Sequence, residues 1–158
     1  SIRRQRQMCI RDSITITCTD NIKSRLDLWN VLAKVPSSSY TDNNTPLYWM
    51  DFGNTKTAGQ VVLGTVPKKI KQPVSTMYET VGSLKVITRF VKYARVKEVD
   101  SGPSCSLAEA LEKQDLFINS TLAQLGCNIL WKMFRHGMIE HHGLFLNLET
   151  MKVNPIGV

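Results

Sequence analysis

The sequence lacks the long apolar run that a membrane-spanning helix requires. No stretch among its 158 residues approaches the roughly 20 consecutive apolar residues that cross a bilayer. The basic N-terminus is not followed by an apolar segment of the kind found in secretory signals. Apolar residues make up 42% of the chain and charged residues 21%, which is typical of a globular domain with one core. We therefore expect no membrane association.

Cysteine is scarce and shows no metal-binding spacing. The chain has four cysteines, and none belongs to a Cys-x-x-Cys pair. This pattern argues against a disulfide framework and a zinc ribbon, so we expect a reducing, cytoplasmic setting and no zinc. Cys18 falls in a predicted strand and Cys127 on an apolar helix face, so we predict that both lie in the core.

Residues 3–12 resemble a cloning or sequencing artefact. They read Arg-Arg-Gln-Arg-Gln-Met-Cys-Ile-Arg-Asp, and translating one frame of a transposase-type sequencing adapter yields the same ten residues. We therefore expect residues 1–12 to be a foreign tail and residues 13–158 to form the domain. Without the four arginines and one aspartate of this tail, the formal net charge falls from +7 to +4. A natural basic arm is the alternative, but the remaining charge gives no reason to expect nucleic acid as a partner.

The hydrophobic pattern predicts an α/β domain. Residues that alternate in a strand-like manner are followed by residues with helical spacing, which is the building block of a parallel sheet. The expected elements in chain order are a strand at 13–18, a helix at 22–34, strands at 47–52 and 60–66 joined by a Gly53-Asn54 turn, a long connection at 67–104 with a short helix near 86–92, a helical region from 106 to 137, and a terminal hairpin over 144–153. Gly126 either divides the helical region or lies inside one helix. We expect Trp29, Trp49 and Trp131 to be core residues.

Four segments resemble a known enzyme family. Cys18-Thr19-Asp20-Asn21, with Arg25 four positions further on, resembles the motif that ends a central strand in the ThiF/MoeB family of ubiquitin-activating-enzyme-like proteins. Gly59-Gln60-Val61 is similar to the start of a later strand in that family. The segments 103–119 and 143–148 look like those of the ThiF-family proteins of the bacterial PRTRC system.

The resemblance implies a Rossmann-like mixed sheet with flanking helices, and an adenylyltransferase activity. Members of the family use ATP and Mg²⁺ to adenylate the C-terminal carboxylate of a ubiquitin-like or sulfur-carrier protein, and they often form homodimers. The glycine-rich loop that receives the ATP phosphates in this family precedes the Thr-Asp-Asn motif and is not found in residues 1–158. We therefore expect an N-terminally truncated domain that is inactive on its own, within an active parent protein.

Asp20 is the strongest candidate for a ligand-binding residue. A carboxylate at the carboxyl end of a parallel strand lies where such sheets bind ligands, and Mg²⁺ prefers one or two carboxylates beside phosphate oxygens. The resemblance assigns Asp20 to Mg²⁺ and ATP, and it places Asn21 and Arg25 at the nucleotide. The alternatives are structural: Asp20 as a helix N-cap, Asn21 as a turn residue and Arg25 as a solvated charge.

Cys105 is the candidate catalytic nucleophile. It lies just before a predicted helix N-terminus, where the helix dipole favours a thiolate. Some family members form a thioester through a cysteine in a comparable connection. A cysteine packed beneath the helix is the alternative. We interpret His136, His141 and His142 as helix-end and turn residues, since Gly137 disrupts metal-ligand spacing.

Two other functions are compatible with the sequence. A Rossmann-type oxidoreductase would have a similar sheet, but it requires a glycine-rich fingerprint followed by an acidic residue, and neither is found in this chain. A non-catalytic interaction domain would keep the fold and lose the nucleotide site. The sequence upstream of the Thr-Asp-Asn motif distinguishes these cases.

Overall fold

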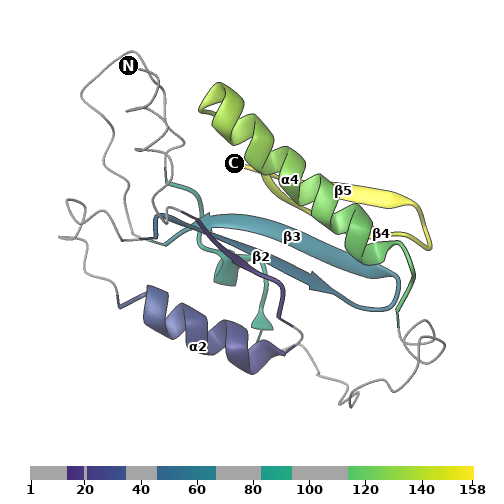
Figure 1. Ribbon diagram of the computed structural model, residues 1–158, viewed down its shortest axis with the longest axis horizontal. Helices are drawn as coiled ribbons and strands as arrows, with labels where there is room; N and C mark the ends of the chain where they lie inside the picture. The colour runs from purple at the N-terminus through teal and green to yellow at the C-terminus, as the bar shows by residue number, and fades with distance from the viewer. Residues whose placement is uncertain (1–13, 20, 35–45, 67–82, 94–113) are drawn as a thin grey trace.

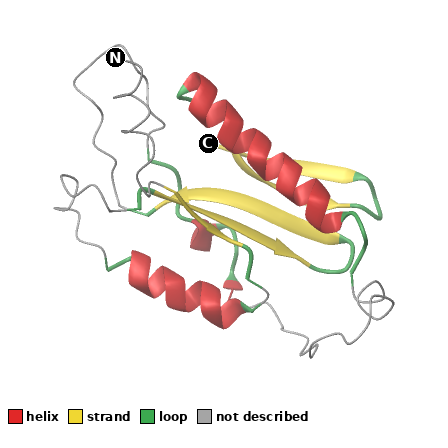
Figure 2. Cartoon of the chain, in the orientation of Figure 1, coloured by secondary structure: helices red, strands yellow, loops and turns green. Residues whose placement is uncertain are grey.

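The computed structural model describes residues 14–19, 21–34, 46–66, 83–93 and 114–158. These residues form a five-stranded mixed sheet with helices on both faces (Figures 1 and 2). The strands lie side by side in chain order: β1 (Ile14–Thr17), β2 (Tyr48–Asn54), β3 (Ala58–Thr65), β4 (His141–Asn147) and β5 (Lys152–Gly157). β1 and β2 are parallel, and every later pair is antiparallel. The predicted mixed α/β sheet is confirmed.

The parallel pair is connected through helix α2 (Ile22–Leu32). Asn21 caps this helix, because its side-chain oxygen accepts a hydrogen bond of 2.7 Å from the backbone N–H of Ser24. The predicted strand–turn–helix unit therefore forms, with Asn21 in the turn. Its helix brings the chain back to start β2 beside β1, as a parallel connection requires.

The sheet separates two apolar cores because successive side chains of a strand point to opposite faces. Met50 and Leu63 face α4 (Ile118–His136), which covers one side of the sheet. Trp49 and Val62 face the other side, where α2 and the short 3₁₀ helix η2 (Ile87–Arg89) pack. The second apolar set includes Trp29, whose ring stacks on that of Trp49 at 5.9 Å. β2 and β3 are thus covered on both faces and form the centre of the molecule.

Helix α4 is continuous through Gly126. A Cβ atom at this position would lie 2.4 Å from the Phe52 ring, so glycine lets the helix approach β2 closely. The helix ends at Gly137, which has a left-handed φ of 72° and donates its N–H to Met133. No helix among the described residues is long and apolar enough to span a bilayer.

The turn between β2 and β3 lies later than predicted. Gly53 and Asn54 belong to β2, where they pair with Gln60 and Gly59, and the chain reverses at residues 55–57. Gly53-Asn54 was a misleading turn signal, because both residues continue the pairing of β2 with β3 and Gly53 lies against the Arg25 guanidinium. The predicted C-terminal hairpin is confirmed as β4 and β5, and Pro155 is tolerated because β5 is an edge strand.

Several predicted core residues lie at the surface instead. Cys18, Cys127 and Trp131 are exposed. The errors at Cys127 and Trp131 have one cause. Helix α4 and its N-terminal turn carry apolar residues on two sides, and the sequence does not reveal which side contacts the sheet. The predicted start of the helical region at residue 106 lies outside the described residues.

We predict that Gly126→Ala destabilises the protein although alanine is the better helix former. The gain in helix propensity is about 1 kcal/mol, whereas overpacking a well-filled core costs about 1–3 kcal/mol. Urea unfolding should therefore show a net loss of stability. Asn128→Ala, on an exposed position of the same helix, is the control and should be neutral or slightly stabilising. A Gly126→Ala protein more stable than the parent chain would contradict the close contact with Phe52.

Candidate functional site

Asp51 is a carboxylate in the middle of β2 with no exposed surface. Both of its oxygens accept short hydrogen bonds. Oδ1 lies 2.6 Å from the Thr17 hydroxyl, and Oδ2 lies 2.6 Å from the Tyr93 hydroxyl. Removing a carboxylate from water costs several kcal/mol, so these donors are needed to offset the loss of hydration.

Arg25 supplies the positive charge next to this carboxylate. Its Nε donates to Asp51 Oδ1 at 3.1 Å, and its side chain is 11% exposed. Its Nη2 donates to the backbone carbonyl of Phe52 at 2.8 Å and to that of Thr19. The Arg25 guanidinium therefore connects Thr19, which follows β1, with strand β2. Because Arg25 itself belongs to α2, these three parts of the chain are held together.

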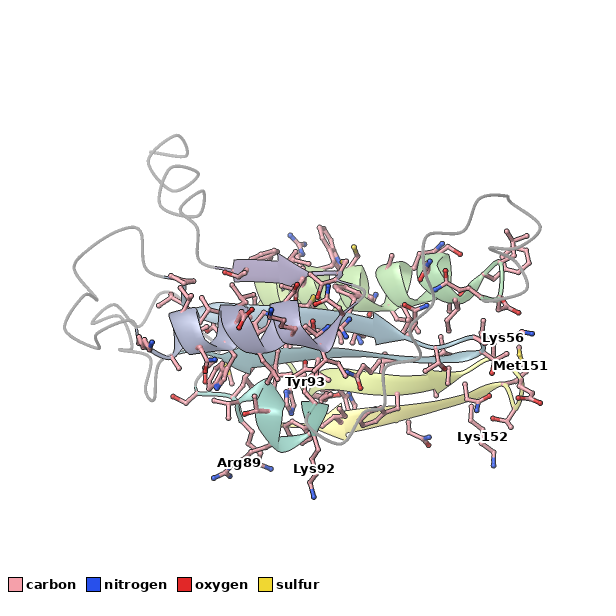
Figure 3. All side chains as sticks on the ribbon, turned by 90° about the horizontal axis from the view of Figure 1, so that it is seen from below. Lys56, Arg89, Lys92, Tyr93, Met151 and Lys152 are labelled. Atoms are coloured by element: carbon pink, nitrogen blue, oxygen red, sulfur yellow. The ribbon has the colours of Figure 1, made fainter. Side chains whose placement is uncertain are left out.

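Tyr93 and Trp49 complete the network. The Trp49 indole N–H donates to the Thr17 hydroxyl at 2.8 Å, so Thr17 connects the indole to the carboxylate. The Tyr93 ring stacks on Trp49 at 6.4 Å, and the Arg25 guanidinium lies 6.0 Å from its centre. Burial, followed by the Asp51 charge, raises the pKa of the Tyr93 hydroxyl, which stays protonated and remains a donor. Figure 3 shows Tyr93 near α2, whereas Arg89 and Lys92 extend away from the sheet.

An open cleft of about 250 Å³ adjoins the network. It lies where β2 ends and β3 begins, close to the start of α2, and its lining includes Arg25, Gly53, Gly59, Gln60 and Tyr93. An added Cβ atom at Gly53 would be 3.3 Å from Arg25 Nη2, so the guanidinium lies against bare backbone there. In open α/β sheets, the carboxyl ends of parallel strands are the usual place for a ligand. The cleft is therefore the candidate binding site.

The structure brings together only part of the predicted site. Arg25 lines the cleft, and Asn21 caps α2 close by. Asn21 therefore has a structural role in the turn before α2, which was the alternative to nucleotide binding. Its side-chain oxygen accepts the hydrogen bond from the Ser24 N–H that caps the helix. Arg25 is bound to protein groups and is not a solvated charge. Asp20 and Cys105 lie outside the described residues.

The histidines do not form a metal site in the described part of the chain, where no group of three or more His, Cys, Asp or Glu side chains lies close enough to hold an ion. His136 ends α4, as predicted, and is exposed, whereas His141 lies at the start of β4 and not in a turn, and it is also exposed. His142 is fully buried instead of lying in a turn. Its Nδ1 donates to the Leu63 carbonyl at 2.6 Å, and the Phe90 ring packs edge-on at 4.9 Å.

The most important residue of this site, Asp51, was not predicted from the sequence. It stands within the run Tyr48-Trp49-Met50-Asp51-Phe52, where its neighbours are apolar. A single carboxylate in a run that is otherwise buried indicates a charge that must find a partner inside the protein. That signal was present, although it does not identify Arg25 or Tyr93 as the partners. Those residues lie 26 and 42 positions further away in the chain.

We predict that Arg25→Met destabilises the protein by about 3–5 kcal/mol, because it leaves the Asp51 charge buried without its cation. Lys23→Met is the matched control, since Lys23 is exposed on the same helix, and it should change stability by no more than about 0.5 kcal/mol. Urea unfolding measures both. Equal stabilities of the two variants would show that the Arg25–Asp51 pair has no structural role.

We predict that protonation of His142 weakens the fold. Burial lowers the pKa of His142 below its ordinary value of 6.5, so below pH 6.5 the unfolded chain binds more protons than the folded one. The stability contributed by neutral His142 is complete above pH 6.5 and is lost as the pH falls. His142→Asn keeps a side-chain N–H donor and should flatten the pH dependence of the melting temperature, whereas His141→Asn should leave it unchanged. A parallel pH profile for the parent chain and His142→Asn would disprove this.

The interpretation of the site depends on its own residues and on the sequence resemblance. The chain matches no protein-family model and no curated protein. The described geometry consists of a buried Arg25–Asp51 pair beside an open cleft, at the carboxyl end of a parallel strand pair. This arrangement fixes Thr19 and the start of α2 at the place where an α/β sheet binds ligands.

Proposed function

We propose that this chain is the C-terminal part of a ThiF-type adenylyltransferase domain with a Rossmann-like sheet. In the parent protein it would activate the C-terminal carboxylate of a ubiquitin-like or sulfur-carrier protein with MgATP. The observation that carries the proposal is the cleft at the carboxyl end of the β1–α2–β2 unit. Two of the segments that resemble the family, residues 18–25 and 59–61, contribute to its lining through Arg25, Gly59 and Gln60.

The position of the cleft supports a ligand with a phosphate or carboxylate group. It opens beside the first turn of α2, where the helix dipole favours negative charge. Gly53 and Gly59 both line the cleft, so strand backbone forms part of its wall. The first turn of α2 carries no acidic residue that would repel an anion.

Arg25 would act in this function as a positioning residue. Its donors are used by Asp51 and by the Phe52 and Thr19 carbonyls, so its main effect is to hold Thr19 against β2. Asp20 directly follows Thr19 in the sequence. In the proposal, its carboxylate is the Mg²⁺ ligand, and the glycine-rich loop for the ATP phosphates is supplied by the preceding part of the parent protein.

The test uses the parent protein, recovered from the gene upstream of residue 13. It should bind MgATP and catalyse exchange of radiolabelled pyrophosphate into ATP in the presence of a ubiquitin-like carrier. Asp20→Asn should reduce exchange on the order of 100-fold, because it removes the charge that binds the metal. Asp27→Asn, at an exposed position of α2, is the matched control and should retain full activity.

Two outcomes would count against adenylation. If the parent protein does not bind MgATP, whether or not a carrier is present, the chain belongs to a non-catalytic interaction domain. If exchange occurs but Asp20→Asn is as active as Asp27→Asn, the cleft at the end of β1 is not the metal site. The 158-residue chain alone should bind MgATP weakly, and tight binding would contradict the need for an upstream phosphate-binding loop.

A further inference from the structure

His142 has no exposed surface, and one of its two ring nitrogens is unpaired. Nδ1 lies 2.6 Å from the Leu63 carbonyl, which can only accept, so Nδ1 carries the proton and Nε2 is a bare acceptor. Nε2 has no hydrogen-bond partner, and among the described residues it is the one buried side-chain nitrogen or oxygen in this state. Buried polar atoms are nearly always paired, so the ring occupies an unusual position.

A β-bulge turns the His142 ring toward η2. Leu144, two residues further along β4, points into the core beneath α4, so strict alternation would place His142 on that side as well. The pairing of β4 with β5 shifts between His141 and Gly143, where β4 contains an extra residue. The ring consequently contacts Phe90, which packs with the opposite core, edge-on at 4.9 Å. Bulges commonly redirect a side chain in this way.

Phe90 connects His142 to the candidate binding site. It directly follows η2 and begins the wall segment, which we define as residues 90–93. Val91 and Tyr93 of this segment both line the cleft, and the Tyr93 hydroxyl donates to Asp51. The His142 ring therefore packs against the segment that forms one wall of the cleft.

We propose that His142 is a pH-sensitive latch on this wall, and that protonation of its ring releases the wall segment and opens the cleft. The neutral ring fits its site, because its single N–H has the Leu63 carbonyl as acceptor. A second proton goes to Nε2 and creates a buried cation, whose new N–H has no acceptor among the described residues. Movement of the wall segment lets water reach this nitrogen.

The charged groups around the ring do not stabilise its cation. Lys85, which precedes η2, repels the protonated ring. β3 has no charged residue, and β5 has none where it pairs with this part of β4. The other titratable side chains of the adjacent described segments are exposed or bound elsewhere: Arg89 and Lys92 extend away from the sheet (Figure 3), Glu140 and His141 are exposed, and Tyr93 is bound to Asp51.

The coupling between protonation and opening has a definite sign. Burial lowers the pKa of His142 below its ordinary value of 6.5, whereas in the open form the hydrated ring titrates near that value. Between these two pKa values the open form binds the proton and the closed form does not. The population of the open form therefore rises up to about 10-fold for each pH unit as the pH falls below 6.5.

Regulation of binding by this latch rests on the proposed function, which assigns the ligand to the same cleft. A ligand that contacts Val91 or Tyr93 binds the closed form, so acidic pH weakens its binding. By reciprocity, the bound ligand disfavours protonation of His142.

Amide hydrogen exchange of the 158-residue chain, measured by NMR without nucleotide, tests the latch. The Val91 N–H donates to the Ile87 carbonyl in the closed form, so its protection factor, which is corrected for the intrinsic effect of pH on exchange, reports the opening. This factor should fall about 10-fold between about pH 7.5 and about pH 5.5. His142→Asn keeps a side-chain N–H but does not titrate, so its factor should not change. His141→Asn is the matched control and should behave as the parent chain does.

Urea distinguishes opening of the wall from unfolding of the whole chain, and this measurement requires no variant. Local opening exposes little surface, so the protection of Val91 should hardly change in low urea, whereas that of Val62 in the central strand β3 should fall. A pH-independent Val91, a pH effect that persists in His142→Asn, or equal urea dependence of Val91 and Val62 would overturn the latch. Since no nucleotide is present, these results do not depend on whether the parent protein adenylates a carrier, which pyrophosphate exchange decides.

Discussion

The structure depends on one buried ion pair, between Asp51 and Arg25. Asp51 has no exposed surface, so its charge is tolerable only while Arg25, Thr17 and Tyr93 all contact it. These partners come from β1, α2 and the segment that follows η2. The carboxylate therefore specifies how three separate parts of the chain meet on β2, a role that apolar contacts fulfil less selectively because they have no direction.

The same pair gives the cleft its shape. The Arg25 side chain lies across the end of β1, where its Nε pairs with Asp51. Its Nη2 group donates to the Thr19 and Phe52 carbonyls. Thr19, the residue before the proposed Mg²⁺ ligand in the sequence, is consequently anchored to the sheet by a side chain that is itself bound to protein groups. Such support from a neighbouring residue is what a metal or nucleotide ligand needs to hold its geometry. Structural and functional interpretations of Arg25 are thus compatible.

Helix α4 shows how one element can serve a core and a surface at once. Gly126 brings one side of the helix against Phe52, and the opposite side presents Trp131 and Phe134 to solvent. A helix that is apolar on two sides is stable only if both sides are covered, or if the outer side binds a partner.

The sequence alone determined the elements and their order, because strand alternation, helical spacing and caps are local properties. The β1–α2–β2 unit, the end of α4 at Gly137 and the C-terminal hairpin followed from it. Only the tertiary structure decided which side of α4 faces the sheet, and so placed Cys127 and Trp131 at the surface. It also decided that Asp51 pairs with Arg25 and Tyr93. Burial and pairing are contacts between residues far apart in the chain, and no local pattern encodes them.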